Sequence, residues 1–246
     1  HKCVFVHIPK VAGQSIEQFF MHRLGLDPNE DREALYLHNN DDPGRGTEKL
    51  SHLSAAEYVG CGHMSATDFA SYFKFSFVRN PWARLLSEYL YRNYFHHRSF
   101  KHFVLEKQPP PAWDDKYRHV MPQYDMLHDE QGQLLVDFVG RFESLQADFD
   151  TVCGRLDITD SQLPHRNSSD KKSRVRKRRI RNALLRNGEN QKQSLDDYYD
   201  AETRAAVAEM YRKDIETFGY EFPAPASAKG AAVRDQRSLQ IDPLPA

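Results

Sequence analysis

The first twenty residues run from an apolar strand through a proline and a glycine turn into a helix, and this order restricts the fold. Residues Cys3 to Ile8 form a short apolar, β-branched run that is typical of a buried strand. Pro9 ends this run because proline cannot donate to a strand ladder. Ala12 and Gly13 allow a tight turn. Apolar side chains then recur at helical spacing, at Ile16, Phe19 and Phe20. The segment therefore predicts the strand, turn and helix of an α/β domain.

The same turn predicts an anion site. Ser15 offers a hydroxyl at the helix N-terminus, where backbone N–H groups and the positive end of the helix dipole face one point, and Lys10 lies beside it. The segment PKVAGQS lacks both the first glycine and the Gly-Lys pair of a Walker A loop, so an ordinary ATP or GTP site is not expected. Taken alone, the segment is also compatible with a plain strand-to-helix turn capped by a serine.

Four segments of the chain resemble one enzyme family. PKVAGQS is similar to the 5′-phosphosulfate loop of sulfotransferases that use 3′-phosphoadenosine 5′-phosphosulfate (PAPS), whose pattern is close to HIPKTAGTS; Val11 and Gln14 replace its two threonines. FSFVRNPWARLLSEY resembles the strand and helix that bind the 3′-phosphate, and VGRFESLQADF and YRKDIETFGYEF also match. The matching segments run from residue 4 to residue 222 in the order of the family. The resemblance is to the Golgi-type and bacterial carbohydrate sulfotransferases (sulfotransferase family 2) that include heparan sulfate 2-O-sulfotransferase.

This resemblance implies both a fold and a reaction. The fold is a single P-loop-like α/β domain with a central parallel sheet flanked by helices. The reaction moves a sulfuryl group from PAPS to an acceptor hydroxyl by in-line transfer with a histidine base, and a neutral or anionic carbohydrate is the expected acceptor. The residues that the resemblance assigns to PAPS are Lys10, Ala12, Gly13, Gln14, Ser15, Arg79, Ser87, Arg166 and Asn167.

His63 and Lys10 are the expected catalytic residues. Tyr58 to Cys61 reads as a short strand that places His63 at its carboxyl end, where ligands bind in open α/β sheets, and the Gly-His pair resembles the position of the family's catalytic base. Lys10 would neutralise charge on the leaving phosphate. Arg79 offers a bidentate fork to a phosphate, although a structural arginine paired with Glu88 or Asp68 is the alternative.

Residues on the acceptor side are expected in HVMPQYDML, a segment that resembles a family stretch near the active site. His119 and Gln123 are its candidate acceptor contacts. The other elements predicted from apolar periodicity are the strands Lys74–Val78 and Leu134–Val139 and the helices Trp82–Tyr94, 144–156 and Ala201–Phe218.

The chain is expected to hold one domain, residues 1–222, followed by an Ala/Pro-rich tail, residues 223–246. Residues 171–181, KKSRVRKRRIR, carry eight basic side chains in eleven positions. They read as a solvated segment, a nucleic-acid contact or a groove for an anionic glycan, and the missing interleaved aromatics count against single-stranded nucleic acid. No nucleic-acid partner is therefore predicted.

Composition bears on the partners, metal content and location of the protein. The net charge is −1, so attraction to an anion must come from local clusters. The three cysteines are widely spaced and read as reduced residues, and no His, Cys, Asp or Glu cluster has metal-ligand spacing, so no metal is predicted. No run approaches the roughly 18 to 20 apolar residues of a membrane span. A cytoplasmic, bacterial-type protein is expected; a Golgi lumenal one is the alternative if a membrane anchor precedes His1.

Two other functions remain open from the sequence. A kinase-like enzyme with a degenerate phosphate loop would need an acidic magnesium ligand after a strand, and Asp137 is the plausible one. A non-catalytic heparin- or nucleic-acid-binding module would be built around the basic run at 171–181.

Overall fold

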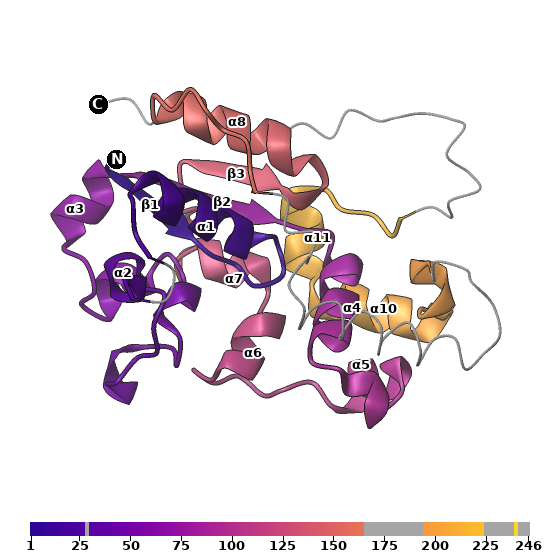
Figure 1. The fold of residues 1–246 in the computed structure, drawn as a ribbon. Helices are drawn as coiled ribbons and strands as arrows, with labels where there is room; N and C mark the ends of the chain where they lie inside the picture. Colours follow the sequence, from indigo (N-terminus) through magenta and orange to yellow (C-terminus); the bar gives the residue numbers. More distant parts are fainter. Residues whose placement is uncertain (28–29, 165–193, 224–238, 241–246) are drawn as a thin grey trace.

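A computed structural model of the chain describes residues 1–27, 30–164, 194–223 and 239–240. Its centre is a sheet in which strands β1 (Cys3–Val6), β2 (Phe73–Val78) and β3 (Phe138–Arg141) are parallel, as Figure 1 shows. A short strand β4 (Leu239–Gln240) lies antiparallel to β3, and the strand order is β1-β2-β3-β4. The predicted α/β fold with a central parallel sheet is confirmed.

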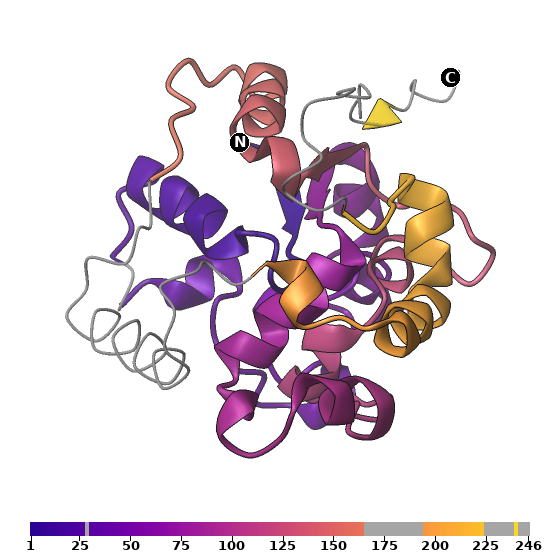
Figure 2. The ribbon, with the colours of Figure 1, turned by 90° about the vertical axis from the view of Figure 1, so that its right-hand side faces the viewer.

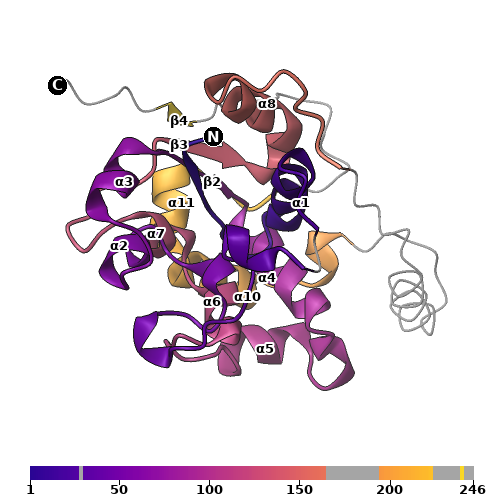
Figure 3. The same ribbon diagram turned by 60° about the vertical axis from the view of Figure 1, so that its left-hand side comes forward.

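Helices cover both faces of this sheet. In Figure 3, α1 and α8 lie on one side, and α7 and α11 lie on the other. The described helices are α1 (Gly13–Arg23), α2 (Glu57–Gly60), α3 (Ala66–Ser71), α4 (Pro81–Tyr91), α5 (Phe100–Glu106), α6 (Asp115–Val120), α7 (Gln123–Leu127), α8 (Leu145–Arg155), α10 (Ala201–Met210) and α11 (Arg212–Phe218). Short 3₁₀ turns lie at Arg32–Leu35, Pro43–Arg45, Leu50–His52, Tyr94–His96, Phe142–Ser144 and Leu195–Asp197.

Aromatic side chains form much of the core between the sheet and helices α1 and α8. Phe19 of α1 meets Phe149 of α8 edge-on at a ring distance of 4.9 Å, and Phe20 packs against Phe75 of β2. Phe75 and Phe149 are fully buried. This packing fixes α1 against the strand that precedes it, which sets the direction of the α1 N-terminus relative to the sheet.

The C-terminal helices form a second packed group. Figure 2 shows α10 beside α4 and α5, although these segments are about a hundred residues apart in the chain. Trp82 at the start of α4 donates its indole N–H to the carbonyl of Arg204, and Tyr199 donates to the carbonyl of Trp82. Phe222 packs against the rings of Trp82 and Tyr199. These contacts hold α4, and with it the end of β2, in place.

Several predicted elements differ from the structure. The predicted strand at Tyr58–Cys61 is wrong, because this segment is the one-turn helix α2; the Glu57 carboxylate accepts the Ser54 N–H and starts the turn. The strand predicted at Leu134–Val139 begins only at Phe138, since Leu134 pairs with His128 in an isolated antiparallel bridge.

The helix predicted at Ala201–Phe218 is two helices that meet at the buried Tyr211, whose hydroxyl bonds the Val120 carbonyl. The helix predicted to reach Tyr94 ends at Tyr91, and Asn93 takes a left-handed conformation. The single domain at residues 1–222 stays a prediction. Strand β4 lies within the predicted tail, so two tail residues contribute to the sheet.

Candidate functional site

The loop between β1 and α1 carries the predicted phosphosulfate motif at the carboxyl end of the sheet. Lys10 and Ala12 have positive φ angles of 75° and 71°, a conformation that is uncommon for residues with a side chain and is often found at functional sites. Ser15 is not the helix cap that the sequence predicted, because Ala12 occupies the cap position and the Ser15 N–H donates to the Ala12 carbonyl. The N-terminus of α1 therefore has no side-chain cap.

Gly13 is needed in this loop for its lack of a side chain. A Cβ atom at Gly13 would lie 2.0 Å from Nε2 of His7 and 2.1 Å from its Cδ2, so the imidazole packs directly against the loop backbone. The other ring nitrogen, Nδ1 of His7, is 2.5 Å from the carboxylate of Glu17.

Arg79 joins the two predicted nucleotide motifs, which are 69 residues apart in the chain. Its Nη1 donates to the Lys10 carbonyl at 3.1 Å, and its guanidinium lies over the Phe142 ring at 4.1 Å. The ion pairs among the described residues do not include Arg79, and its buried Nε has no hydrogen-bond partner among them. Burial lowers the pKa of Arg79, but an arginine still keeps its charge. A half-buried cation beside the loop favours an anionic ligand.

The alternative partners of Arg79 are engaged elsewhere. Glu88 binds Arg92 and His119, and Asp68 accepts the hydroxyl of Ser65. Ser87 lies half-buried on α4, the helix that follows Arg79. Lys10 places its Nζ over the Tyr91 ring, 3.7 Å from the centroid.

The described contacts of His63 are with Arg45 and Tyr36, and not with Lys10, Arg79 or Ser87. Nε2 of His63 is 2.7 Å from the carbonyl oxygen of Arg45, and the Tyr36 hydroxyl donates a hydrogen bond to the backbone carbonyl of His63. It lines a cavity of about 490 Å³ that extends along β1 from Cys3 to His7. No described hydrogen bond or ring contact joins His63 to residues 10–15, to Arg79 or to Ser87. His63 as the base therefore stays a prediction that these contacts do not support.

The two predicted acceptor contacts are buried and bonded to protein groups. Gln123 is fully buried; its Oε1 accepts the Arg79 N–H, and its Nε2 donates to the Arg79 carbonyl and to Asp214. This side chain fixes the backbone of Arg79. His119 is 6% exposed, with Nδ1 2.6 Å from Glu88 and Nε2 3.5 Å from Asp115. Their roles as acceptor contacts stay predictions.

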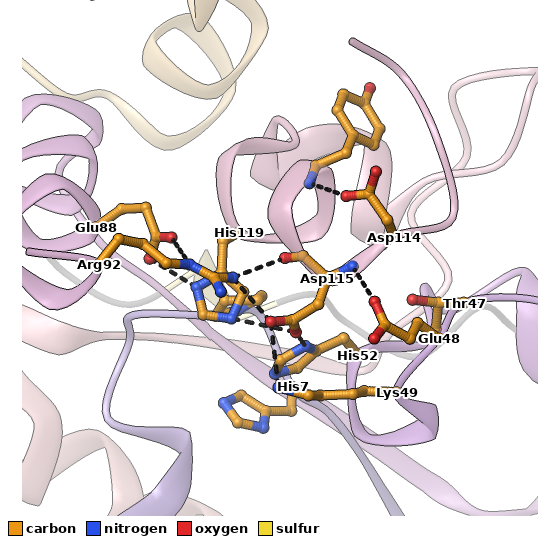
Figure 4. A network of polar contacts seen from close by, with 12 residues as sticks. His7, Thr47, Glu48, Lys49, His52, Glu88, Arg92, Asp114, Asp115 and His119 are labelled. Carbon is orange, nitrogen blue, oxygen red and sulfur yellow. Dashed lines mark hydrogen bonds and ion pairs between the residues drawn. The ribbon is translucent and has the colours of Figure 1, made fainter. Parts of the chain in front are cut away.

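His119 belongs to a buried polar cluster that the sequence did not reveal, drawn in Figure 4. Asp115 and His119 lie one turn apart on α6, and His52 enters from the turn at Leu50–His52. Nδ1 of His52 is 3.1 Å from Oδ1 of Asp115, whereas Oδ2 of Asp115 binds Arg92 at 2.8 Å and Lys49 at 3.1 Å. Only the i, i+4 spacing of Asp115 and His119 could have signalled this cluster.

Burial and charge set the protonation of this cluster. Burial lowers the pKa of His52 to about 4, although Asp115 accepts its hydrogen bond. Burial also opposes ionisation of Asp115, but hydrogen bonds from His119, His52 and Arg92 lower its pKa well below the usual range. At neutral pH His52 is therefore neutral and Asp115 is ionised.

One atom each from His52, Asp115 and His119 lies within 4.8 Å of the other two, which is close enough for a metal ion. The statement that no cluster has ligand spacing was therefore wrong for this trio. Two cationic side chains already bind Oδ2 of Asp115 and oppose a divalent ion there. The absence of a metal from the reaction stays a prediction.

Comparison with known proteins shows the family of the chain. The family described as "Sulfotransferase family" matches residues 1–221. The chain belongs to the sulfotransferase family. This sulfotransferase is also 34% identical, over 94 residues, to an uncharacterized protein of Archaeoglobus fulgidus; the alignment covers 37% of the chain and 72% of that relative. The search of solved structures gave no match. The protein is thus an enzyme that moves a sulfuryl group to a hydroxyl-bearing acceptor.

Arg84 contacts the loop between β1 and α1, and no motif in the sequence indicated this contact. It is 1% exposed, its Nε donates to the Pro9 carbonyl at 3.2 Å, and its Nη2 donates to the carbonyls of His119 and Met121. One side chain thus ties the loop between β1 and α1 to the end of α6. The position of Arg84 on α4 carried no separate signal in the sequence.

Some predictions lie outside the described residues. Arg166 and Asn167, predicted to contact the nucleotide, and the basic run at 171–181 belong to this group. Within the described part of this sulfotransferase, no helix is long and apolar enough to cross a membrane.

The kinase alternative has no support in the sheet. Asp137 precedes β3 and therefore lies at the amino end of the parallel strands, opposite the loop between β1 and α1. Its carboxylate binds the backbone N–H and Nζ of Lys74 at the start of β2. A magnesium ligand at that end could not reach a phosphate held beyond the carboxyl end of β1.

Proposed function

We propose that this sulfotransferase uses PAPS as its donor and sulfates a carbohydrate hydroxyl by in-line transfer, with a histidine as the base. The contact between Arg79 and the Lys10 carbonyl carries the proposal, because it brings the predicted 3′-phosphate and 5′-phosphosulfate motifs together. The unpartnered Nε of Arg79 fits a phosphate group that this nucleotide has and ATP lacks. The carbohydrate acceptor rests on the resemblance of the sequence segments alone.

Two sets of residues would bind the two ends of the nucleotide's phosphate groups, the 5′-phosphosulfate and the 3′-phosphate. Lys10 and the N-terminus of α1, from Ala12 through Gly13 and Gln14 to Ser15, would hold the 5′-phosphosulfate with cationic charge and the helix dipole. Arg79 and Ser87 would hold the 3′-phosphate, with Arg166 and Asn167 as further predicted contacts. Bound PAPS supplies the sulfuryl group. Lys10 would also stabilise the charge that grows on the leaving phosphate.

Calorimetry with the desulfated nucleotide PAP tests the donor. We expect the wild-type protein to bind PAP and to bind magnesium-ATP much more weakly. Arg79→Ala should cost about 2 to 4 kcal/mol of PAP binding, because one partner of a buried charge-assisted contact is lost. Arg212→Ala is the control, since Arg212 is 64% exposed on α11. A wild-type protein that binds magnesium-ATP and ignores PAP would refute the proposal.

The acceptor class needs a separate measurement. Incubation with ³⁵S-labelled PAPS and a panel of neutral sugars, sulfated glycans, phenols and peptides should label the sugars or glycans. Labelling of phenols or peptides alone would retain the donor and replace the acceptor.

A further inference from the structure

A cavity of about 490 Å³ lies along the outer edge of strand β1. Among the described strands, β1 is the first in the order β1-β2-β3-β4, so this edge pairs with no described strand. The cavity extends along it from Cys3 to His7, and helices α1, α2 and α3 and the turn at Arg32–Leu35 contribute its other walls. Its volume is within the range of small-molecule sites in proteins.

One end of the cavity borders the loop between β1 and α1. His7 lines the cavity, and its imidazole packs directly against Gly13 of the loop. Glu17 lines the cavity from α1, and His63, the predicted base, lines it as well. A ligand that fills the cavity would therefore contact both the predicted base and the imidazole that lies against the loop.

The wall beside His63 is aromatic. The Tyr36 ring meets the His63 ring edge-on with centroids 6.1 Å apart, and it meets the Tyr58 ring edge-on at 6.3 Å. The Tyr36 hydroxyl donates to the His63 carbonyl, and the Tyr58 hydroxyl donates to the Phe5 carbonyl. Because both hydroxyl protons are used within the protein, these tyrosines offer a ligand ring surface and no further donor.

Most of the remaining lining is apolar too. Twelve of the nineteen lining residues are apolar or aromatic. Val4 and Tyr58 are buried, whereas Leu24 is 49% exposed, so the cavity opens to solvent near an apolar side chain. A partly open cavity with such a lining favours a ligand that has an apolar body.

The described lining includes carboxylates but neither lysine nor arginine. Its two acidic residues are Glu17 and Asp68. Arg32 interacts electrostatically with Glu17, but it lies outside the lining, and its Nε donates to the Leu37 carbonyl. An anionic group placed in the cavity would lose water without gaining a lysine or arginine partner from these residues. The described lining therefore disfavours a sulfated or carboxylated glycan.

We propose that this cavity holds the apolar body of the acceptor, and that the acceptor is an uncharged sugar joined to an aryl or alkyl group. This inference rests on the proposed function and names its acceptor class. The sugar hydroxyl gives its proton to the predicted base His63 while its oxygen forms a bond to sulfur. The bond between sulfur and the bridging phosphate oxygen breaks, and its electron pair leaves with PAP.

Matched glycosides test the acceptor class. ³⁵S-labelled PAPS is incubated with the methyl and 4-nitrophenyl β-glycosides of glucose, galactose and N-acetylglucosamine, and with 4-nitrophenyl β-glucuronide and β-galacturonide. The 4-nitrophenyl glycosides should show kcat/KM at least about tenfold above their methyl counterparts, because the aryl ring enters the apolar cavity. Each uronide should be at least about tenfold worse than the matching neutral glycoside, since it adds a carboxylate without a cationic partner.

A binding measurement needs neither nucleotide nor turnover. The uncharged dye N-phenyl-1-naphthylamine should bind the wild-type protein at one site. Its 8-sulfonate, which has the same rings and one negative charge, should bind at least about tenfold more weakly. The 4-nitrophenyl glycosides should displace the uncharged dye, which would show that acceptor and dye share the cavity.

Two substitutions reduce the cavity from different walls. Ala34 lines it at an exposed position and Ser51 at a half-buried one. Ala34→Trp and Ser51→Phe should each weaken binding of the uncharged dye and raise the KM of the 4-nitrophenyl glycosides by about tenfold, with PAP affinity unchanged. Ala205→Trp, at an exposed position of α10 outside the lining, is the matched control and should behave as wild type.

The outcomes separate this inference from the proposed function. A wild-type protein that neither binds PAP nor consumes PAPS refutes the proposed function, and the acceptor role of the cavity with it. PAP binding together with equal use of methyl and 4-nitrophenyl glycosides, or with a preference for the uronides, overturns the acceptor class alone. Dye binding that is the same in wild type, Ala34→Trp and Ser51→Phe overturns the assignment of the apolar body to this cavity.

Discussion

In the loop between β1 and α1, Gly13 has no space for a larger side chain. Gly13 is buried and its φ angle is not positive, so it is required for space and not for backbone freedom. The imidazole of His7 fills the place where a Cβ atom would lie, and His7 is held there by Glu17 and by the ring of His52. His7 therefore connects the loop between β1 and α1 to the buried cluster of His52, Asp115 and His119.

We predict that Gly13→Ala weakens both stability and nucleotide binding. The new methyl group must displace His7 or α1, which should lower the free energy of unfolding by about 1 to 3 kcal/mol and reduce PAP affinity. Gly154→Ala on α8 is the matched control, because nothing lies within 4 Å of its Cβ position. Chemical denaturation and calorimetry give both values. Equal stability and equal PAP affinity of the two variants would contradict the packing described for Gly13.

His52 should also shape the pH dependence of stability. Its pKa is near 4 in the folded protein and about 6.5 in an unfolded chain, so the unfolded state binds more protons between these values. Stability should therefore fall as the pH drops from 6.5 to 4, by about 3 kcal/mol from this group. The titratable groups facing it are His7, Asp115 and His119.

His52→Gln should flatten the decline between pH 6.5 and 4 in thermal unfolding. His128→Gln is the comparison variant in the same thermal unfolding series, because burial lowers the pKa of His128 as it does that of His52. An unchanged pH profile in His52→Gln would show that His52 titrates in the folded protein as it does in the unfolded chain.

At the scale of elements, α7 and α11 form the support for Arg79. Asp214 of α11 is fully buried and accepts the N–H groups of Gln123 and Tyr124 and the side-chain amide of Gln123. Gln123 in turn binds the backbone of Arg79 on both sides. Burial raises the pKa of Asp214, which the backbone donors only partly offset. The position of Arg79 thus depends on a helix that is more than 130 residues further along the chain.

We predict that Asp214→Ala destabilises the protein by about 2 to 4 kcal/mol, since three buried donors lose their acceptor. PAP affinity should fall as well, because Gln123 would no longer hold Arg79 at the carboxyl end of β2. Lys213→Ala, at a 64% exposed neighbouring position, is the control and should match wild type in both measurements. Normal PAP affinity in a folded Asp214→Ala protein would mean that this support is not needed.

At the scale of the whole molecule, residues 220–222 pack against the start of α4. Tyr220 is buried and donates to Glu143, which also accepts the Asn80 N–H at the start of α4. Phe222 packs against Trp82 and Tyr199. Beyond these residues, the described contact with the sheet is the two-residue pairing of β4 with β3.

A truncation series tests the predicted boundary. A chain ending at Phe222 should unfold within about 1 kcal/mol of the full protein and bind PAP normally, because it keeps every buried aromatic contact described here. A chain ending at Gly219 should be strongly destabilised, since it loses Tyr220 and Phe222. A large loss in the longer truncation would show that the segment from 223 onward belongs to the domain.

The sequence by itself determined the local units and the family. The strand, turn and helix at residues 3–23 follow from apolar spacing and a proline stop, and the motifs at 9–15 and 75–89 carry the sulfotransferase resemblance. These features depend on neighbours within a few positions, which sequence patterns report directly. The tertiary structure decided which distant side chains meet. His7, His52 and the Asp115–His119 pair come from three separate segments of the chain, and Arg84 of α4 reaches the Pro9 carbonyl in the loop between β1 and α1. His63 is predicted as the base because its Gly-His pair resembles a family motif, and this role stays a prediction. Only packing determines that the imidazole of His7 lies against Gly13 in the loop between β1 and α1.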